Sequence, residues 1–520
     1  MTADDIASLT DRVRSGATSS RELVEMLLDR VAGDGGPDGV HAVLETNPDA
    51  VTDTTRLDAE RGAGRIRGRL HGMPVLIKDN VDTAAPLHTT GGSYALKGTS
   101  PLRDATVVTN LRAAGLLVLG KTNLSEWANY RSTHSISGWS AVGGMTRNPY
   151  DHARSPCGSS SGSGAGVAAG LAPLAVGTET DGSIICPAAF CGVVGLKPTL
   201  GLVPTAGVIP ISRSQDVVGP MTGTVREAAM LLAAMSGRTD AGALDPSHSD
   251  VDRFPLRGVR LGLPRDGLWT REPRVGSVVE AAVKVLASLG ATIIDPVQIP
   301  SLAEIDDTDE LTVLDHELKV GLAAYLATRA PGGPQTLADL IAFNRAHADV
   351  ELALFDQDIF ERAEATTGLD ATAYRSARDR CVRISRTEGL DPVFATHDLD
   401  ALVMPSADLA FSLGPAVGGG PDAHRDPGAD RDHGAHRDQG AQYAGGRAVS
   451  ATSLPAMAGY PMLTVPCGLV DGLPVGLGLA GLAGADRVLL RVGHAYEVAA
   501  FGPAGAAAAL PPPRPGRSVV

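Results

Sequence analysis

A lysine at the end of an apolar run is the first residue of this sequence that could do chemistry. In GMPVLIKDN, residues 72–80, Lys78 follows a stretch typical of a buried strand. An ammonium group that is buried dry and unpaired destabilises a fold by several kcal/mol. Lys78 must therefore reach solvent, pair with a carboxylate, or lose its proton and serve as a base. Asp79 is a poor partner, because adjacent strand residues point to opposite faces.

A Gly/Ser-rich segment, SPCGSSSGSGAGVAAG, covers residues 155–170. A flexible linker would not run directly into a helix-forming stretch, and a phosphate-binding loop would need the lysine of GxxxxGK[ST]. The GxSxG pattern centred on Ser160 imitates the nucleophile elbow of α/β-hydrolases. An elbow follows a strand, however, and the preceding NPYDHARSPC contains two prolines. The segment is therefore interpreted as a loop that enters a helix of small residues.

A second loop, GTETDGSIICPA at residues 177–188, follows the apolar run LAPLAV. It could simply connect two strands. Its chemical interest is that consecutive backbone N–H groups from Thr180 to Ser183 can line one concavity, which is what the oxyanion of an acyl transfer requires. Ser183, at the end of such a nest, is placed to attack a carbonyl carbon.

Together these segments resemble the signature region of the amidase signature family. The Gly/Ser loop, GTETDGSI and FCGVVGLKPTLGLVP carry the likeness, which extends through GPDGVHAVLETNPDA, LHGMPVLIKDNVDT, LGKTNLSEWAN, GVIPISRSQDVVGPMTGTV and SLPAMAGYPMLTVPCGLVDGLPVGLGLAG. It covers roughly two thirds of the chain. The resemblance implies the α/β amidase signature fold, a large, mixed, twisted sheet covered by helices on both faces (α/β/α), in one catalytic domain over residues 1–505.

The resemblance also implies roles for single residues. Lys78 becomes the base, Ser159 the cis-peptide serine that relays the proton, and Ser183 the nucleophile. Ser160 becomes a supporting donor, and Thr178 helps to order the loop. The backbone donors of the oxyanion hole fall on Thr180, Asp181, Gly182 and Ser183. Neither a metal ion nor an organic cofactor is implied.

Ile185 departs from a common pattern of the family, which has Arg two places after the nucleophile. The variant DGSIICPA resembles the peptide amidase branch, as do NPYDHARSPCGSSSGSGAGVAAG and SISGWSAVGG. The resemblance implies a hydrolase that converts a carboxamide to a carboxylate and ammonia through an acyl-enzyme, with C-terminal peptide amides as the favoured substrates. The alternatives are a glutaminase-type subunit of a multi-protein amidotransferase and a general aliphatic or aryl amidase.

The elements around these segments alternate as strand, helix and strand. Residues 73–79 and 116–120 are predicted as strands, with a helix over 105–115 between them. Further strand-like runs at LAPLAVGT, GVRLGLP, ATIIDPV and ALVMP alternate with helical stretches. One of these covers 274–289 and places on one face Val275, Val279, Ala282, Leu286 and Leu289. The pattern predicts a large, mostly parallel sheet around a signature core at 70–235.

The flanking regions are predicted to be different in kind. Residues 1–65 are expected to carry N-terminal helices, one opened by a capping box from Ser19 to Glu22. Residues 300–390 are mainly helical in pattern and belong to a variable region, 300–450, that the resemblance assigns to the substrate pocket.

A low-complexity segment covers residues 415–447, and the tail 506–520 is expected to be disordered. The histidines of the segment, His424, His433 and His436, could suggest a metal site. A mobile polar loop is the favoured interpretation, because no apolar residues are available to fix a ligand geometry.

The net charge of −14 disfavours nucleic acids and anionic membranes as partners. We expect a small-molecule or peptide amide substrate and a monomer or homodimer. The N-terminus MTADDIASLTDRVRSG lacks the basic and apolar regions of a signal peptide, and no window of about 18 apolar residues follows, which predicts a cytoplasmic protein.

The five cysteines form an odd set without a CxxC pair or a zinc-ligand spacing: Cys157, Cys186, Cys191, Cys381 and Cys467. This argues against a disulfide framework and a structural zinc site, and favours a reducing compartment. Cys157 and Cys186 flank the two catalytic loops, where simple packing is expected rather than covalent catalysis.

Two further lysines and two tryptophans have competing interpretations. Lys121 and Lys197 could serve as the base, but their turn-like contexts, GKTN and LKPT, favour ordinary backbone or carboxylate pairing. Trp127 and Trp139 could form a wall of the pocket or pack in the core.

Overall fold

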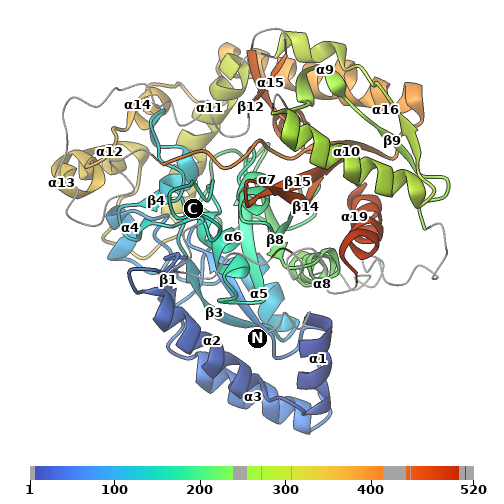
Figure 1. The fold of residues 1–520 in the computed structure, drawn as a ribbon. Helices are drawn as coiled ribbons and strands as arrows, with labels where there is room; N and C mark the ends of the chain where they lie inside the picture. Colours follow the sequence, from blue (N-terminus) through green and yellow to red (C-terminus); the bar gives the residue numbers. More distant parts are fainter. Residues whose placement is uncertain are drawn as a thin grey trace.

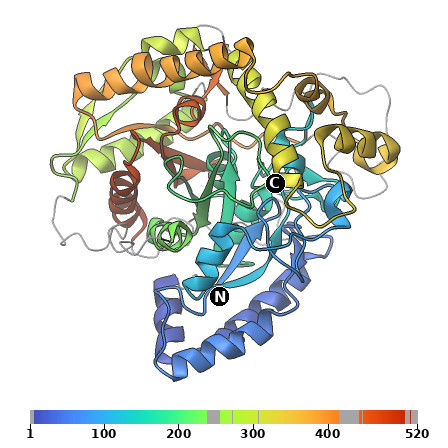
Figure 2. The same cartoon turned by 180° about the vertical axis from the view of Figure 1, so that it is seen from behind.

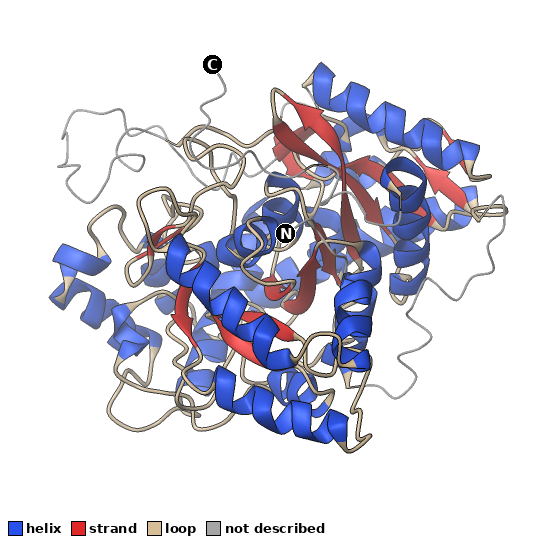
Figure 3. Ribbon diagram, turned by 60° about the horizontal axis from the view of Figure 1, so that its bottom comes forward, coloured by secondary structure: helices blue, strands red, loops and turns tan. Residues whose placement is uncertain are grey.

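An eleven-stranded sheet runs through the molecule, with helices on both sides (Figure 1 and Figure 3). The computed structural model describes residues 6–237, 255–270, 272–305, 307–413, 441–444, 447–502 and 510. In chain order the strands of this sheet are β1 (Val43–Thr46), β2 (Pro74–Lys78), β3 (Leu117–Thr122), β6 (Leu174–Glu179), β7 (Val194–Lys197), β8 (Val217–Thr222), β9 (Arg260–Gly262), β10 (Thr292–Ile294), β11 (Ala401–Pro405), β14 (Met462–Val470) and β15 (Leu473–Ala480). The predicted α/β/α class with a large mixed sheet is confirmed.

The strand order is β1–β3–β2–β6–β8–β7–β14–β15–β11–β9–β10. Pairing is parallel within β3–β2–β6 and within β11–β9–β10, but antiparallel through the middle of the sheet. The expectation of a mostly parallel sheet is therefore wrong. One cause is the tight connection of β14 to β15 through Asp471 and Gly472, both with positive φ (52° and 78°), because a two-residue turn can only join antiparallel strands.

The strands β2, β3 and β6 place their carboxyl ends at one edge of the sheet. All residues of β2 are buried, and β2 pairs in parallel with both of its neighbours. The predicted helix between β2 and β3 is α5 (Thr106–Ala113). Because the chain leaves all three strands at the same edge, the loops after β2 and β6 meet there.

The small residues of the Gly/Ser segment form α6 (Ser161–Ala168), which packs against β2, β3 and β6. A Cβ atom on Gly162 would lie 2.3 Å from the carbonyl oxygen of Ala42, and one on Gly164 would lie 3.0 Å from that of Pro187. Larger residues would therefore push α6 away from its neighbours, and the glycines allow its start to approach the sheet.

Three helices at the N-terminal end lie together at the bottom of the view in Figure 1: α1 (Ile6–Ser15), α2 (Ser20–Asp34) and α3 (Ala50–Gly62). The predicted capping box is present, because the Ser19 side chain accepts from the Glu22 N–H and the Glu22 carboxylate accepts from the Ser19 N–H.

Later helices cover the second half of the sheet. They are α7 (Ile185–Phe190), α8 (Val225–Ser236), α10 (Pro273–Ser288) and α19 (Asp486–Phe501). The predicted apolar face of α10 is buried from Val275 to Leu286, and Leu289 after its end is half-buried. α10 packs against β14, β15 and α19, whereas α7 packs against β7, β14 and β15.

The region 300–390 is mainly helical, as predicted. Its α-helices are α11 (Asp307–Leu326), α12 (Leu337–Ala346), α13 (Ala348–Glu351), α14 (Asp358–Glu364) and α15 (Thr372–Val382). α11 contacts both α14 and α15, and Figure 1 and Figure 2 show α12, α13 and α14 at one side of the molecule. One apolar cluster joins this region to the signature core through Trp127 and Ile209.

Most of the low-complexity segment lies outside the described residues, as do His424, His433 and His436. Its end does not match the predicted loop, because β12 (Ala441–Ala444) pairs with β13 (Arg447–Ser450). The predicted tail also lies outside the described residues apart from Leu510, whose carbonyl oxygen accepts from the Tyr150 hydroxyl. Among the helices that the structure describes, none is long and apolar enough to cross a membrane.

Candidate active site

Lys78 is the last residue of β2, and its side chain is fully buried. Its Nζ lies 2.7 Å from Ser159 Oγ, 2.8 Å from Thr178 Oγ1 and 3.3 Å from the carbonyl oxygen of Thr178. Burial lowers the pKa of Lys78 well below the ordinary lysine value, and the opposing influence of Glu179 and Asp216 does not cancel this effect. Burial therefore makes the neutral amine more favourable here than in a lysine exposed to water.

Ser159 stands in the loop that leads into α6, and the peptide bond from Gly158 to Ser159 is cis. Its carbonyl oxygen accepts from the Ser125 N–H at 3.1 Å, and its hydroxyl faces Lys78. Three consecutive serines begin here, and the cis bond distinguishes Ser159 from the other two.

Ser160 connects the Gly/Ser loop to Thr178 on β6 and to Ser183 in the loop after β6. Its hydroxyl donates to the Thr178 carbonyl oxygen (3.0 Å), and its N–H donates to the Ser183 carbonyl oxygen (3.1 Å). Residues 146–158 form turns and one isolated bridge rather than a strand before Ser160. A nucleophile elbow is therefore not formed there.

Ser183 lies in the loop between β6 and α7, rather than between two strands, and is 7% exposed. Gly182 before it has φ +79°, a left-handed conformation that favours glycine. Within the described residues, no hydrogen bond joins the hydroxyls of Ser159 and Ser183. A backbone hydrogen bond from the Ser160 N–H to the Ser183 carbonyl oxygen connects their loops.

Side chains from distant segments fix the loop after β6. The Asp181 carboxylate accepts from the hydroxyls of Thr452 and Ser453, the latter at 2.9 Å, and the Thr180 hydroxyl donates to Asp216 at 2.6 Å. In the described part of the chain, no hydrogen bond engages the N–H groups of Thr180, Asp181, Gly182 and Ser183. The loop is held through its side chains, and its N–H groups stay available to an oxyanion.

Two carboxylates of the site are Glu179, which is buried, and Asp216, which is half-buried. One oxygen of Glu179 accepts from the N–H groups of Ile184 and Ile185 at 2.7 and 2.9 Å, which anchors the start of α7. Burial raises the pKa of Glu179, and it raises that of Asp216 to about 6 although Thr180 and two backbone N–H groups donate to it. Burial thus weakens the preference of both groups for the charged form.

The competing lysines are both fully buried and lie in strands, not in turns. Lys121 Nζ donates to the carbonyl oxygen of Val81 at 2.6 Å and lies 3.7 Å from Asp79. Lys197 Nζ donates to the carbonyl oxygens of Pro455 and Tyr460. Both therefore have the ordinary pairing expected of structural lysines, and Asp79 faces Lys121 rather than Lys78.

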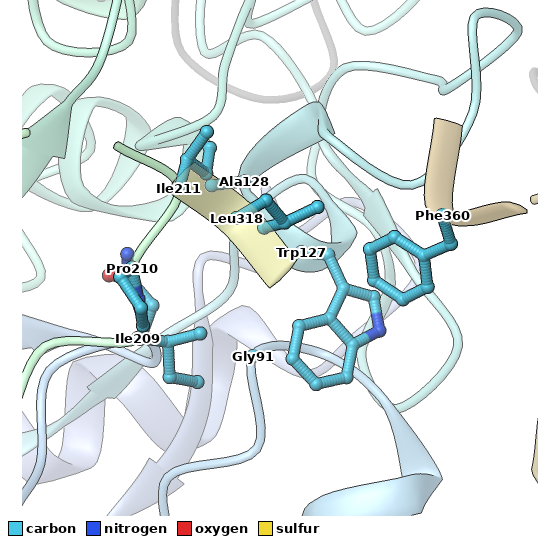
Figure 4. Close-up of a pocket in the computed structure, with 9 residues that line it drawn as sticks. Gly91, Trp127, Ala128, Ile209, Pro210, Ile211, Leu318 and Phe360 are labelled. Carbon is cyan, nitrogen blue, oxygen red and sulfur yellow. The ribbon is translucent and has the colours of Figure 1, made fainter. Parts of the chain in front are cut away.

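Two small cavities meet beside these residues. The first, about 240 Å³ with open solvent included, is lined by polar groups that include Ser159, Thr178 and Asp216. The second, about 260 Å³ on the same basis, is mostly apolar, and Figure 4 shows Trp127 as one of its walls. The other tryptophan, Trp139, packs edge-on against Phe355. Trp127 is thus a pocket wall as well as part of the core.

Cys157 and Cys186 form a disulfide bond. The expectation that they pack as separate thiols is wrong, because the bond depends on two loops that are far apart in sequence and meet at the edge of the sheet. The inference of a reducing compartment from cysteine usage loses its support. The bond ties the residue before Gly158 to the second residue of α7, next to both loops of the site.

Asn80 is the main site residue that sequence reasoning missed. Its Nδ2 donates to Thr178 Oγ1 at 2.9 Å, beside the Lys78 amine, and the residue lines both cavities. The available signal was its nearness to Lys78 in sequence: Asn80 lies two residues later, in the turn that follows β2.

One group of side chains in the described residues could share a cation: His134, Asp356 and Asp358. His134 and Asp356 are exposed, and the carboxylates already accept from the hydroxyls of Ser132 and Thr133. This group shares no residue with the cavities described above.

Known proteins resemble this chain over almost its whole length. The family model described as Amidase matches residues 22–490. The native peptide amidase of Stenotrophomonas maltophilia superposes with a TM-score of 0.83 and is 44% identical, covering 96% of this chain and 97% of that chain.

Two curated relatives carry different names. A probable amidase of Arabidopsis thaliana is 35% identical over 495 residues, which are 92% of this chain and 87% of the relative. One subunit of the glutamyl-tRNA(Gln) amidotransferase of Symbiobacterium thermophilum is 36% identical over 500 residues, or 93% and 94% of the two chains. The chain therefore belongs to the amidase signature family and is a hydrolase that acts on the C–N bonds of amides.

Proposed function

We propose that this chain is a serine amidase that converts a carboxamide to a carboxylate and ammonia through an acyl-enzyme. Ser183 is the nucleophile, Ser159 the relay and Lys78 the base. The observation that carries the proposal is the set of partners around Lys78: two oxygens of Thr178 and the Ser159 hydroxyl, with no carboxylate in hydrogen-bond contact among the described residues.

A neutral amine has two N–H donors and one lone pair. Thr178 offers two acceptors, its hydroxyl and its carbonyl oxygen, and these use both N–H groups of Lys78. The lone pair is then left for the Ser159 hydroxyl at 2.7 Å. Ser159 can donate its proton to Lys78 while accepting one from Ser183, because a hydroxyl donates and accepts at once.

The reaction follows from this relay. The Ser183 hydroxyl oxygen forms a bond to the amide carbon while its proton moves through Ser159 to Lys78. The oxyanion is stabilised by the N–H groups of residues 180–183. The proton returns to the departing nitrogen, the C–N bond breaks and ammonia leaves. Water, activated by the same relay, then hydrolyses the ester of Ser183 and releases the carboxylate.

For the substrate we favour a C-terminal peptide amide. The support is the likeness to a peptide amidase over 96% of this chain. A second observation concerns Ile185, which is fully buried in an apolar cluster that includes Leu454 and Met457. It can offer no positive charge to the carboxylate of free glutamine. The likeness to one chain of an amidotransferase makes glutamine hydrolysis the alternative to be tested.

The test uses the purified chain alone and measures ammonia release from N-acetyl-alaninamide and from free glutamine. We expect hydrolysis of the peptide-like amide without a partner. Ser183→Ala should lower kcat by about 10⁴-fold or more, with an unchanged circular dichroism spectrum. Activity on glutamine alone would favour the amidotransferase role, and a Ser183→Ala enzyme that keeps most of its rate would place the nucleophile elsewhere.

A further inference from the structure

We infer that the apolar cavity binds the side chain on the acyl side of the scissile amide, and that it selects small aliphatic side chains. This inference rests on the proposed function. The neighbouring cavity, lined by polar groups that include Ser159, Thr178 and Asp216, is called the catalytic cavity below. The ligand is the C-terminal residue of an amidated peptide: its carbonyl carbon faces Ser183, its side chain enters the apolar cavity, and its own N–H is bound by Asn80.

The walls of this cavity are almost entirely apolar. Figure 4 shows Trp127 and Phe360 on one side, Ile209 on the other and Leu318 between them. These four side chains are buried, and the rings of Trp127 and Phe360 pack edge-on with centroids 5.5 Å apart. An aliphatic group gains contacts with these walls, whereas a charged group would lose its water and meet only two unpartnered polar atoms, Trp127 Nε1 and Asn80 Oδ1.

The apolar cavity and the catalytic cavity share part of their lining. Asn80, Ala128, Ile209 and Ile211 line both. Ser183 lines neither cavity, and Ser159 is the serine of the site that lines the catalytic one. A substrate that places its carbonyl group beside Ser159 can therefore extend its nearest side chain past the shared residues into the apolar cavity.

Asn80 provides the polar group at this boundary. Its Nδ2 is used by Thr178, but its Oδ1 is buried and has no hydrogen-bond partner. A buried acceptor without a donor is destabilising unless a ligand supplies one. The backbone N–H of the substrate, attached to the same Cα as the side chain, is a donor of the right kind and position.

Gly91 lies between two walls of the cavity, Ile209 and Trp127. A Cβ atom on Gly91 would lie 3.1 Å from Ile209 Cδ1 and 3.6 Å from Trp127 Cε3. A single carbon added there would touch both walls, so they stand close together. Such narrow spacing favours the side chains of alanine and valine over the ring of phenylalanine.

The backbone of the wall supports a binding role. Trp127, Ala128 and Asn129 all have left-handed φ values, 49°, 55° and 68°, although none is glycine. Such strained residues persist where the surrounding structure fixes them, and they cluster at ligand sites. Trp127 and Ala128 both line the cavity.

The first experiment measures kcat/KM for N-acetyl amides of Gly, Ala, Val, Phe, Asp and Lys. In the wild type we expect roughly tenfold gains from Gly to Ala or Val, and losses of about tenfold or more for Phe and for the charged residues. Leu318→Ala should enlarge the cavity and raise the Phe-to-Ala ratio of kcat/KM about tenfold.

Leu322→Ala is the matched control. Leu322 lies one turn further along α11, is fully buried in the same apolar cluster, and does not line the cavity. Its substitution should destabilise the fold to a similar extent and leave the substrate ratios unchanged. Thermal unfolding of both variants establishes that the comparison is between folded enzymes.

The second experiment tests Asn80 by replacing the substrate N–H with oxygen. O-acetyl-lactamide should be hydrolysed at least tenfold less efficiently than N-acetyl-alaninamide by the wild type, because the buried Asn80 Oδ1 stays unpaired. In Asn80→Ala this difference should disappear. The comparison is internal to each enzyme, so a general loss of rate in the variant does not affect it.

The outcomes separate the two proposals. If no N-acetyl amide is hydrolysed, including that of glycine, the proposed function fails. If the glycine amide is hydrolysed through Ser183 but the side-chain series is flat, the subsite is refuted while the function stands. Equal Phe-to-Ala ratios of kcat/KM in Leu318→Ala and Leu322→Ala would also refute the subsite. If Leu318→Ala does not fold, the wild-type substrate series and the lactamide comparison decide whether the subsite exists.

Discussion

Loss of the Cys157–Cys186 bond should weaken both the fold and the catalytic loops. The bond closes a loop of 29 residues. The chain-entropy relation for a loop of this length gives about 3.6 kcal/mol of stabilisation. With an unfolding entropy of about 2.1 cal/mol/K per residue, a chain of 520 residues has about 1.1 kcal/mol/K, so Tm should fall by about 3 °C when the bond is removed.

The assay begins with a thiol count in denaturant. Cys191, Cys381 and Cys467 are free, so three thiols should react before reduction and all five after it. Thermal unfolding and ammonia release are then measured with and without reductant. We expect kcat to fall more than KM changes, because the bond joins the loops that carry Ser159 and Ser183 and so affects the placement of the reacting hydroxyls.

Cys157→Ala is the control that shows whether an effect of the reductant comes from the Cys157–Cys186 bond. A reductant should lower the Tm of the wild type and leave that of Cys157→Ala unchanged, because the variant has no bond to lose. Five reactive thiols in the untreated wild type, or equal Tm values with and without reductant, would refute the reasoning.

Five further predictions concern the site itself. Ser159→Ala should lower kcat by about 10²- to 10⁴-fold, because it removes the proton relay, while the circular dichroism spectrum stays unchanged. Because burial depresses the pKa of Lys78, kcat/KM measured against pH should fall on the acid side as the amine gains a proton. In the pH range between the depressed pKa of Lys78 in the folded chain and its ordinary pKa in the unfolded chain, the unfolded chain binds more protons than the folded one. The free energy of unfolding, measured by denaturant titration, should therefore rise with pH in that range, and it should rise less in Lys78→Met. Gly182→Ala places a side chain at φ +79°, 3.2 Å from Thr452 Oγ1, and should lower kcat and destabilise the fold by about 1 to 2 kcal/mol, as measured by steady-state kinetics and thermal unfolding. EDTA should leave the rate of ammonia release unchanged, since each proposed step uses only side chains and backbone N–H groups; an EDTA-sensitive enzyme would contradict the mechanism.

Features that a short window of sequence determines were predictable. An apolar run ending in Lys78 predicted a buried strand, and the spacing of apolar residues from Val275 to Leu286 predicted α10 with its buried face. The loop at 180–183 was predicted from a cluster of turn-forming residues after an apolar run. In each case the periodicity and the turn chemistry act within about one element.

Features that depend on contacts between distant segments were not predictable in the same way. The bond between Cys157 and Cys186 requires two loops to meet, and cysteine spacing alone does not show that they do. The contact of Asn80 with Thr178 joins residues 98 positions apart. The antiparallel middle of the sheet was a different kind of miss, because Asp471 and Gly472 form an Asp-Gly turn that is itself a strong hairpin signal.

Three fully buried lysines on strands of one sheet show why residue type alone does not define the base. Lys197 is bound by two carbonyl oxygens, and burial lowers its pKa to about 8. Burial lowers the pKa of Lys121 as well, although the nearby Asp79 carboxylate favours its charged form. None of their oxygen partners lines either cavity of the site. Lys78 differs because its partners, Ser159 and Thr178, line the catalytic cavity, so a proton taken by the amine can come from a hydroxyl that a substrate reaches. In the proposed mechanism, desolvation makes Lys78 a base, and the Ser159 hydroxyl between the amine and the cavity connects that base to the substrate.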